Sequence, residues 1–111
     1  MKHNFFLIII ILLAISCNKE ETNIGTIEIS FANNVLNRRV EIFAMENTNY
    51  PIHIGNSFGR SFSTSLSFGN YLVGVSSHSE TGLYTKVGFQ LNKTNKIVKV
   101  VYDEYKQGHI K

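Results

Sequence analysis

The strongest constraint on the fold is an alternation of apolar and polar residues that runs almost throughout from Gly25 to Tyr102. The segment Ser61–Phe68, SFSTSLSF, shows it most clearly, because every second residue is a serine. Period-two alternation puts the two sets of side chains on opposite faces of a β-strand, and no segment keeps helical spacing over a comparable length. The sequence therefore predicts an all-β domain.

Turn signals divide this region into about seven short strands, which predicts a small antiparallel β-sandwich over residues 25–102. Lys96 and Lys99 on the last expected strand are typical of an edge strand that must avoid pairing with its neighbours. Residues 103–111 show no pattern, and we expect them to form a frayed tail. The expected strands lie within residues 26–31, 39–45, 52–54, 61–68, 71–76, 83–91 and 96–102.

One internal segment resembles a known type of sandwich. Leu66–Val75, LSFGNYLVGV, is similar to the L-x-x-G-x-Y-x-[VL]-x-V segment of transthyretin-like and carboxypeptidase-regulatory-like domains. The resemblance implies that Gly69 turns between two strands and that Tyr71 packs at the sandwich edge. The glycine and proline usual between the first two strands of that superfamily are absent, so an immunoglobulin-like sandwich is the alternative. Such folds carry many functions and imply none.

Residues 1–16 have the features of a cleaved signal peptide. A short start with Lys2 precedes an unbroken apolar run of 11 residues, Phe5–Ile15. A helix needs about 20 residues to span a bilayer, so this run has the length of a signal-peptide core and not of a transmembrane anchor.

The only cysteine follows this run. Ala14-Ile15-Ser16-Cys17 resembles the lipobox of bacterial lipoprotein precursors, although Ala14 stands where leucine is commoner in that family. The resemblance implies that Cys17 is lipidated, that the leader is cut before it, and that residues 17–24 form a polar tether. Two or three acyl chains on one cysteine anchor a protein stably to a membrane, whereas a single chain does not.

The residues after Cys17 bear on location. Lys19, Glu20 and Glu21 resemble the short signal that sends some Gram-negative lipoproteins to the outer face of the outer membrane. We therefore expect an outer-membrane protein at the cell surface. Retention on the periplasmic leaflet is the alternative, in which these charges only solvate the tether.

The expected domain offers little for catalysis. It has no phosphate loop, no serine elbow and no paired carboxylates, and His78 and Glu80 are expected in a solvated loop. We expect neither an enzyme nor a bound metal or cofactor. The formal charge of +3 comes from interleaved lysines and glutamates, which argues against nucleic acid as a partner.

Two functional hypotheses remain. The first is a binding or accessory module that contacts an envelope protein or a glycan through aromatic residues in or beside loops, for which the candidates are Tyr50, Phe58 and Tyr84. The chain has no tryptophan, which tells mildly against a glycan and favours protein contact. The second is a structural subunit or spacer of a larger envelope assembly.

Overall fold

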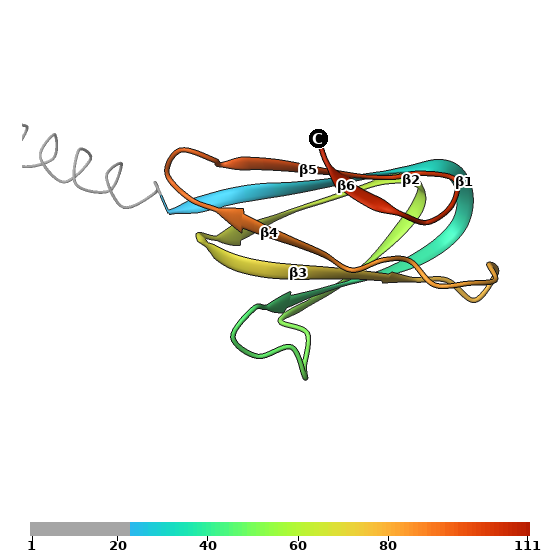
Figure 1. The fold of residues 1–111 in the computed structure, drawn as a ribbon, viewed down its shortest axis with the longest axis horizontal. Helices are drawn as coiled ribbons and strands as arrows, with labels where there is room; N and C mark the ends of the chain where they lie inside the picture. Colours follow the sequence, from blue (N-terminus) through green and yellow to red (C-terminus); the bar gives the residue numbers. More distant parts are fainter. Residues whose placement is uncertain (1–22) are drawn as a thin grey trace, which may run out of the picture.

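The computed structural model describes residues 23–111, which form an all-β domain (Figure 1). No helix occurs among these residues, so the all-β prediction is confirmed. The strands number six and not seven. They are β1 (Ile24–Ala44), β2 (His53–Ser67), β3 (Gly69–Ser76), β4 (Val87–Leu91), β5 (Ile97–Tyr102) and β6 (Gly108–Ile110).

The count differs because two pairs of expected strands are each one long strand, whereas β6 lies where no strand was expected. β1 has 21 residues and β2 has 15, and the two pair antiparallel along most of their length. The register shifts between Ser30 and Arg38, and here the two-stranded ribbon turns back on itself (Figure 1). We call residues 31–38 the bend. Asn33 and Asn34 redirect β1 without ending it, because β2 follows the same course beside them.

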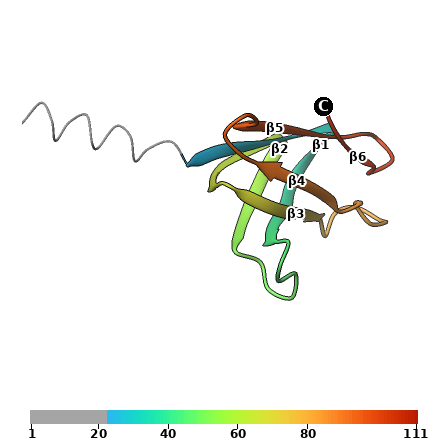
Figure 2. The same cartoon turned by 60° about the vertical axis from the view of Figure 1, so that its left-hand side comes forward.

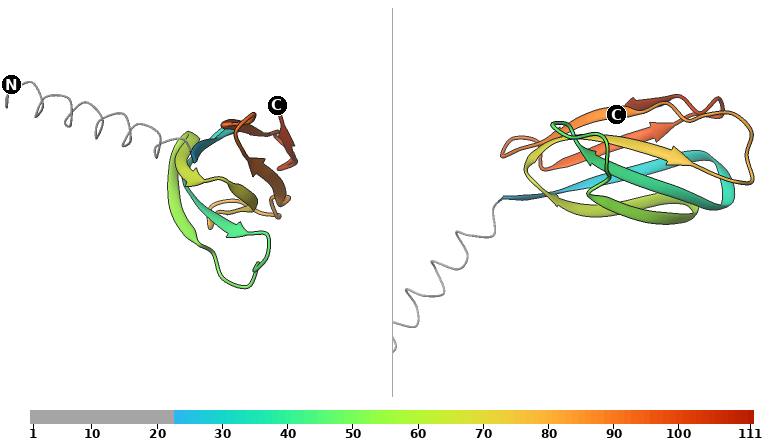
Figure 3. Two further views of the ribbon diagram at one scale, coloured as in Figure 1. Left: turned by 90° about the vertical axis from the view of Figure 1, so that its left-hand side faces the viewer. Right: turned by 90° about the horizontal axis from the view of Figure 1, so that it is seen from below.

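The sheet has the order β4-β3-β1-β5-β6, with β2 paired to β1 beside this path. The second half of β1 pairs with β3 antiparallel, whereas its first half pairs with β5 in parallel, Thr26 opposite Ile97. The purely antiparallel prediction is therefore wrong, because the connection after β4 delivers β5 next to the first half of β1 in the same direction. The sheet curls around its core and nearly closes, with β4 beside β5 and β6 (Figures 2 and 3).

The core is built from the inward residues of the alternating strands. Outside the bend, the inward residues of β1, β3, β4 and β5 are buried, except Ala44 and Gly69 at strand ends, which are partly buried. The alternation therefore correctly identifies the core faces of these strands. In β2 the inward residues Phe62 and Leu66 are only partly buried, because no strand covers its outer edge. The core consists of Ile27, Ile29, Phe31, Val40, Ile42, Tyr71, Val73, Val75, Val87, Phe89, Leu91, Val98, Val100 and Tyr102.

Three expectations near the carboxyl end need correction. β5 is no edge strand, because it lies between β1 and β6. The tail is partly ordered, because its residues Gly108–Ile110 form β6 and pair with β5. Gly108 also lies against Tyr102 in a space too small for a Cβ atom. Leu83 does not begin a strand: it is exposed in the 77–86 loop, and β4 starts at Val87.

Candidate interaction site at the distal end

The two ends of the domain differ in what they carry. β1 begins at Ile24 at one end, beside the turns that join β2 to β3 and β4 to β5 (Figure 1). The other end carries the bend, residues 57–60 of β2, the 77–86 loop and the 103–107 turn (Figure 1). We call it the distal end, because it lies away from the point where the chain enters the domain.

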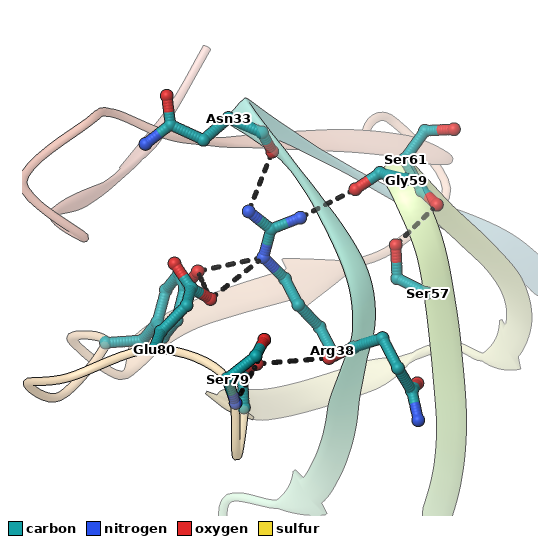
Figure 4. Close-up of polar contacts among 10 residues, drawn as sticks. Asn33, Arg38, Ser57, Gly59, Ser61, Ser79 and Glu80 are labelled. Atoms are coloured by element: carbon teal, nitrogen blue, oxygen red, sulfur yellow. Dashed lines mark hydrogen bonds and ion pairs between the residues drawn. The ribbon is translucent and has the colours of Figure 1, made fainter.

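Arg38 organises the distal end. Only 1% of its surface is exposed, yet each nitrogen of its guanidinium group has a partner (Figure 4). Nη1 donates to the Gly59 carbonyl at 2.6 Å and Nη2 to the Asn33 carbonyl at 2.7 Å. Nε donates to the Tyr84 hydroxyl at 2.8 Å and lies 3.5 Å from Oε1 of Glu80. One side chain thus connects β1, β2 and the 77–86 loop.

Aromatic rings complete the environment of Arg38. Its guanidinium lies 4.1 Å from the centre of the Phe31 ring, and Phe31 stacks on Tyr102 with 5.5 Å between ring centres. Tyr84 meets both rings edge-on. A cation over an aromatic face is stabilised by the ring quadrupole, most strongly where water is excluded. The buried charge of Arg38 is therefore balanced by Glu80, by two carbonyl groups and by these rings.

The tyrosine hydroxyls of this cluster are polar groups held away from water. Tyr84 donates a short hydrogen bond to Oε1 of Glu80, and Tyr102 donates to the Thr85 carbonyl at 2.8 Å. Burial, followed by the Glu80 hydrogen bond, raises the pKa of Tyr84 above its usual value, although Arg38 opposes this. Burial, together with the charge of Tyr84, raises the pKa of Tyr102 to about 12. Both hydroxyls thus act as neutral donors near pH 7.

Beside this ordered cluster, two large apolar side chains are exposed among the asparagines of the bend. Leu36 is 86% exposed and Phe58 is 76% exposed. Together with Asn34, Val35 and Gly59 they line a shallow hollow of about 260 Å³. Exposed aromatic and aliphatic side chains beside a hollow are typical of a surface that contacts another molecule.

The structure brings together two of the three predicted binding residues. Phe58 and Tyr84 both lie at the distal end, where Arg38 contacts Tyr84 and the residue next to Phe58. Tyr84 is half-buried and belongs to the Arg38 cluster, so Phe58 is the one predicted residue that presents an exposed aromatic face there. Tyr50 is exposed in the 45–52 loop between β1 and β2, away from the distal end. The three candidates therefore do not form one patch.

Sequence reasoning missed Arg38 and misjudged Glu80. Glu80 is largely buried and ion-paired, not solvated, whereas His78 is exposed as expected. A signal for Arg38 exists, because it shares the strand parity of Val40 and Ile42 and therefore points inward. The predicted lipidation site Cys17 and the predicted export residues Lys19, Glu20 and Glu21 lie outside the described residues.

Within residues 23–111, no group of three or more histidine, cysteine, aspartate or glutamate side chains is placed to hold a metal ion. The same part of the chain contains no helix long and apolar enough to cross a membrane. The chain matches no protein-family model, and no curated protein is significantly similar to it. The candidate site therefore rests on the geometry of the distal end.

Proposed function

We propose that this chain is a lipid-anchored, non-catalytic binding module of the Gram-negative cell envelope. Cys17 carries the lipid, residues 17–24 form the tether, and the outer face of the outer membrane is its location. The folded β1–β2 ribbon, with a different neighbour strand on each half of β1, supports a transthyretin-like or immunoglobulin-like sandwich as the architecture. The distal end contacts the partner.

The observation that carries the proposal is the exposure of Phe58 and Leu36 on a surface whose backbone Arg38 holds in place. An exposed apolar side chain does not by itself destabilise a fold. When a partner covers it and removes it from water, the free energy falls, which favours binding. A rigid surface loses little conformational entropy on binding, which favours affinity. β1 begins at the other end of the domain, so this surface lies away from the point where the described chain enters the fold (Figure 1).

An envelope protein fits the hollow better than a glycan. Leu36, Val35 and Phe58 supply its apolar lining, and Asn34 is the one polar side chain. A glycan needs several hydrogen-bonding groups beside its aromatic platform, because its hydroxyls must be satisfied when they leave water. An apolar side chain of a protein partner needs no such hydrogen-bonding groups.

Anchoring is tested on the full-length chain expressed in a Gram-negative host. A diacyl or triacyl mass on the peptide that begins at Cys17 is the expected result, and an unmodified Cys17 or a retained leader would overturn the anchor. Treatment of intact cells with an external protease then distinguishes the two possible locations of the domain. Loss of the domain from intact cells supports surface display, whereas digestion only after the outer membrane is opened supports the periplasmic leaflet.

Binding is tested with a photo-crosslinking amino acid in place of Phe58 in the full-length chain. We expect a discrete protein adduct from position 58 that weakens when Leu36→Ser is added. Tyr50 is the matched control, because it is an equally exposed aromatic residue away from the distal end. Equal adducts from positions 50 and 58, or none from position 58, would contradict the proposed surface.

The alternative, a structural subunit of an envelope assembly, has its own supporting observation. β2 pairs with β1 on one side, and no other strand among residues 23–111 pairs with it. A long strand with an open edge is a feature of proteins that join sheets with a partner.

A further inference from the structure

The outer edge of β2 is an open pairing surface. β2 is the second-longest strand of the described domain, and β1 alone pairs with it. Its second half, Ser61–Ser67, contains neither a charged residue nor a proline. Soluble proteins usually protect edge strands with charges, prolines or bulges, because open backbone groups pair readily with another chain. The register shift beside Gly59 ends before Ser61, so it does not protect the backbone groups of the Ser61–Ser67 edge.

The side chains of this half also leave apolar area uncovered. Phe62 and Leu66 point to the core and pack against it, yet both remain only partly buried. Phe62 fits there because it lies over Gly55 in the first half of β2, where a Cβ atom would approach its ring to 2.5 Å. The serines between these residues are exposed. A strand added at this edge would cover the apolar side chains and satisfy the open backbone groups.

We propose that a second copy of this chain occupies the edge, with the two β2 strands antiparallel and a two-fold axis at Thr64. In this register Phe62 stands opposite Leu66 and Ser63 opposite Ser65, so apolar residues meet on one face and hydroxyls on the other. Both are favourable cross-strand pairs. An interface of this kind is isologous, since each copy supplies the same segment.

The charges of the β2 segment are compatible with pairing between two copies of this chain. The nearest charged residue of β2 is Arg60, and in this register it faces Phe68 of the other copy and not a second arginine. The pairing therefore brings no like charges opposite each other, whereas directly opposed like charges destabilise a sheet. A strand of a different protein is the competing occupant.

The test uses the full-length chain, purified in detergent and also held in its native membrane. Ser63→Lys/Ser65→Lys places lysine opposite lysine on both sides of the axis. We expect the wild-type chain to be a dimer and this variant to dissociate with a dissociation constant raised about tenfold or more, as measured by analytical ultracentrifugation. Ser76→Lys/Gln90→Lys is the matched control with equal charge on exposed positions of β3 and β4, and it should remain a dimer.

Disulfide trapping checks the register independently of how the lysine variant folds. Thr64→Cys places a thiol opposite its copy at the axis, so mild oxidation in the membrane should give a covalent dimer. The wild-type chain, whose only cysteine is Cys17, reports any background from that residue, and Ser76→Cys should add nothing to it. A monomeric wild-type chain, a dimer indifferent to the lysines, or a Thr64→Cys chain trapped only on another protein would overturn the proposal.

Discussion

The Arg38 guanidinium donates a 2.6 Å hydrogen bond from Nη1 to the carbonyl of Gly59, and so connects the two strands of the folded ribbon where they turn back. Gly59 has a φ of 125°, a conformation that other residues rarely adopt, and the register of β1 and β2 shifts beside it. The bend thus depends on a glycine that permits the backbone path and on an arginine that satisfies its carbonyl groups. The exposed Phe58 lies next to this point in the sequence.

Replacing Arg38 is expected to weaken the whole domain. Arg38→Ala leaves Glu80 as a largely buried carboxylate without its cation, so we expect a loss of about 3–5 kcal/mol in the free energy of unfolding. Urea denaturation of the variant and the wild-type chain measures it. Arg39→Ala is the matched control, because Arg39 is 54% exposed and pairs with Glu41 on the surface, where a loss below about 1 kcal/mol is expected. Equal losses in the two variants would show that the burial of Arg38 has no energetic consequence.

The raised pKa of Tyr102 predicts a loss of stability in alkali. The unfolded chain releases this proton near pH 10 and the folded chain near pH 12, so the contribution is complete below pH 10 and disappears as the pH rises to about 12. The loss amounts to about 2–3 kcal/mol over this interval. Urea denaturation at pH 8 and at pH 12 measures it in the wild-type chain.

Tyr102→Phe supplies the control for this pH dependence. The variant keeps the ring that stacks on Phe31 but loses the hydrogen bond to Thr85, which costs about 1 kcal/mol near pH 7. It has no hydroxyl to ionise, so its stability should fall less than that of the wild-type chain between pH 10 and 12. An unchanged slope would mean that other groups cause the alkaline loss.

The all-β class and the core faces were predictable because alternation reports directly which side chains share a strand face. Ile27, Ile29, Val73 and Phe89 are buried as their parity indicates. The strand count was not predictable in the same way. Asn33 and Asn34 are typical turn residues, but a turn residue also fits a bend in a continuous strand, and only the pairing of β2 along both halves of β1 distinguishes the two.

The candidate site was predictable only in part, because it depends on contacts between segments far apart in the sequence. Loop position suggested Phe58 and Tyr84 as exposed aromatic residues, yet Tyr84 is half-buried through its contact with Arg38, 46 residues away. Glu80 was expected in water for the same reason, since its partner is invisible in the local sequence. The β5–β1 pairing is likewise long-range and could not be read from the local sequence. Because β5 lies between β1 and β6, the open edge is at β2 and not at β5 as predicted.

The conformation of Gly59 predicts a cost for any side chain there. Gly59→Ala places a Cβ atom on a backbone with φ of 125°, which strains the bend whatever space surrounds it, and a loss of about 1–3 kcal/mol is expected. Gly74→Ala is the control within β3, where the nearest atom to a Cβ is an ordinary 3.7 Å contact with Phe43. That change should cost less than about 1 kcal/mol in urea denaturation. A tolerated Gly59→Ala would mean that the bend adopts another conformation.

A second glycine tests the parallel pairing of β1 and β5. Thr26 donates its backbone N–H to the Lys96 carbonyl at 2.7 Å, and a Cβ atom on Gly25 would lie only 2.7 Å from the same oxygen. A backbone atom cannot rotate away as a side chain does, so Gly25→Ala should separate the two strands and lower the free energy of unfolding by about 1–3 kcal/mol.

Gly88→Ala is the matched control for Gly25→Ala. The atom nearest to a Cβ there is the terminal methyl group of Met45 at 3.2 Å, which moves easily, so a loss below about 1 kcal/mol is expected. Hydrogen exchange locates the effect, because the Thr26 amide should exchange faster in Gly25→Ala and not in Gly88→Ala. Unchanged stability and unchanged Thr26 exchange in Gly25→Ala would mean that β5 does not lie beside the first half of β1, which would contradict the order of the sheet at that point.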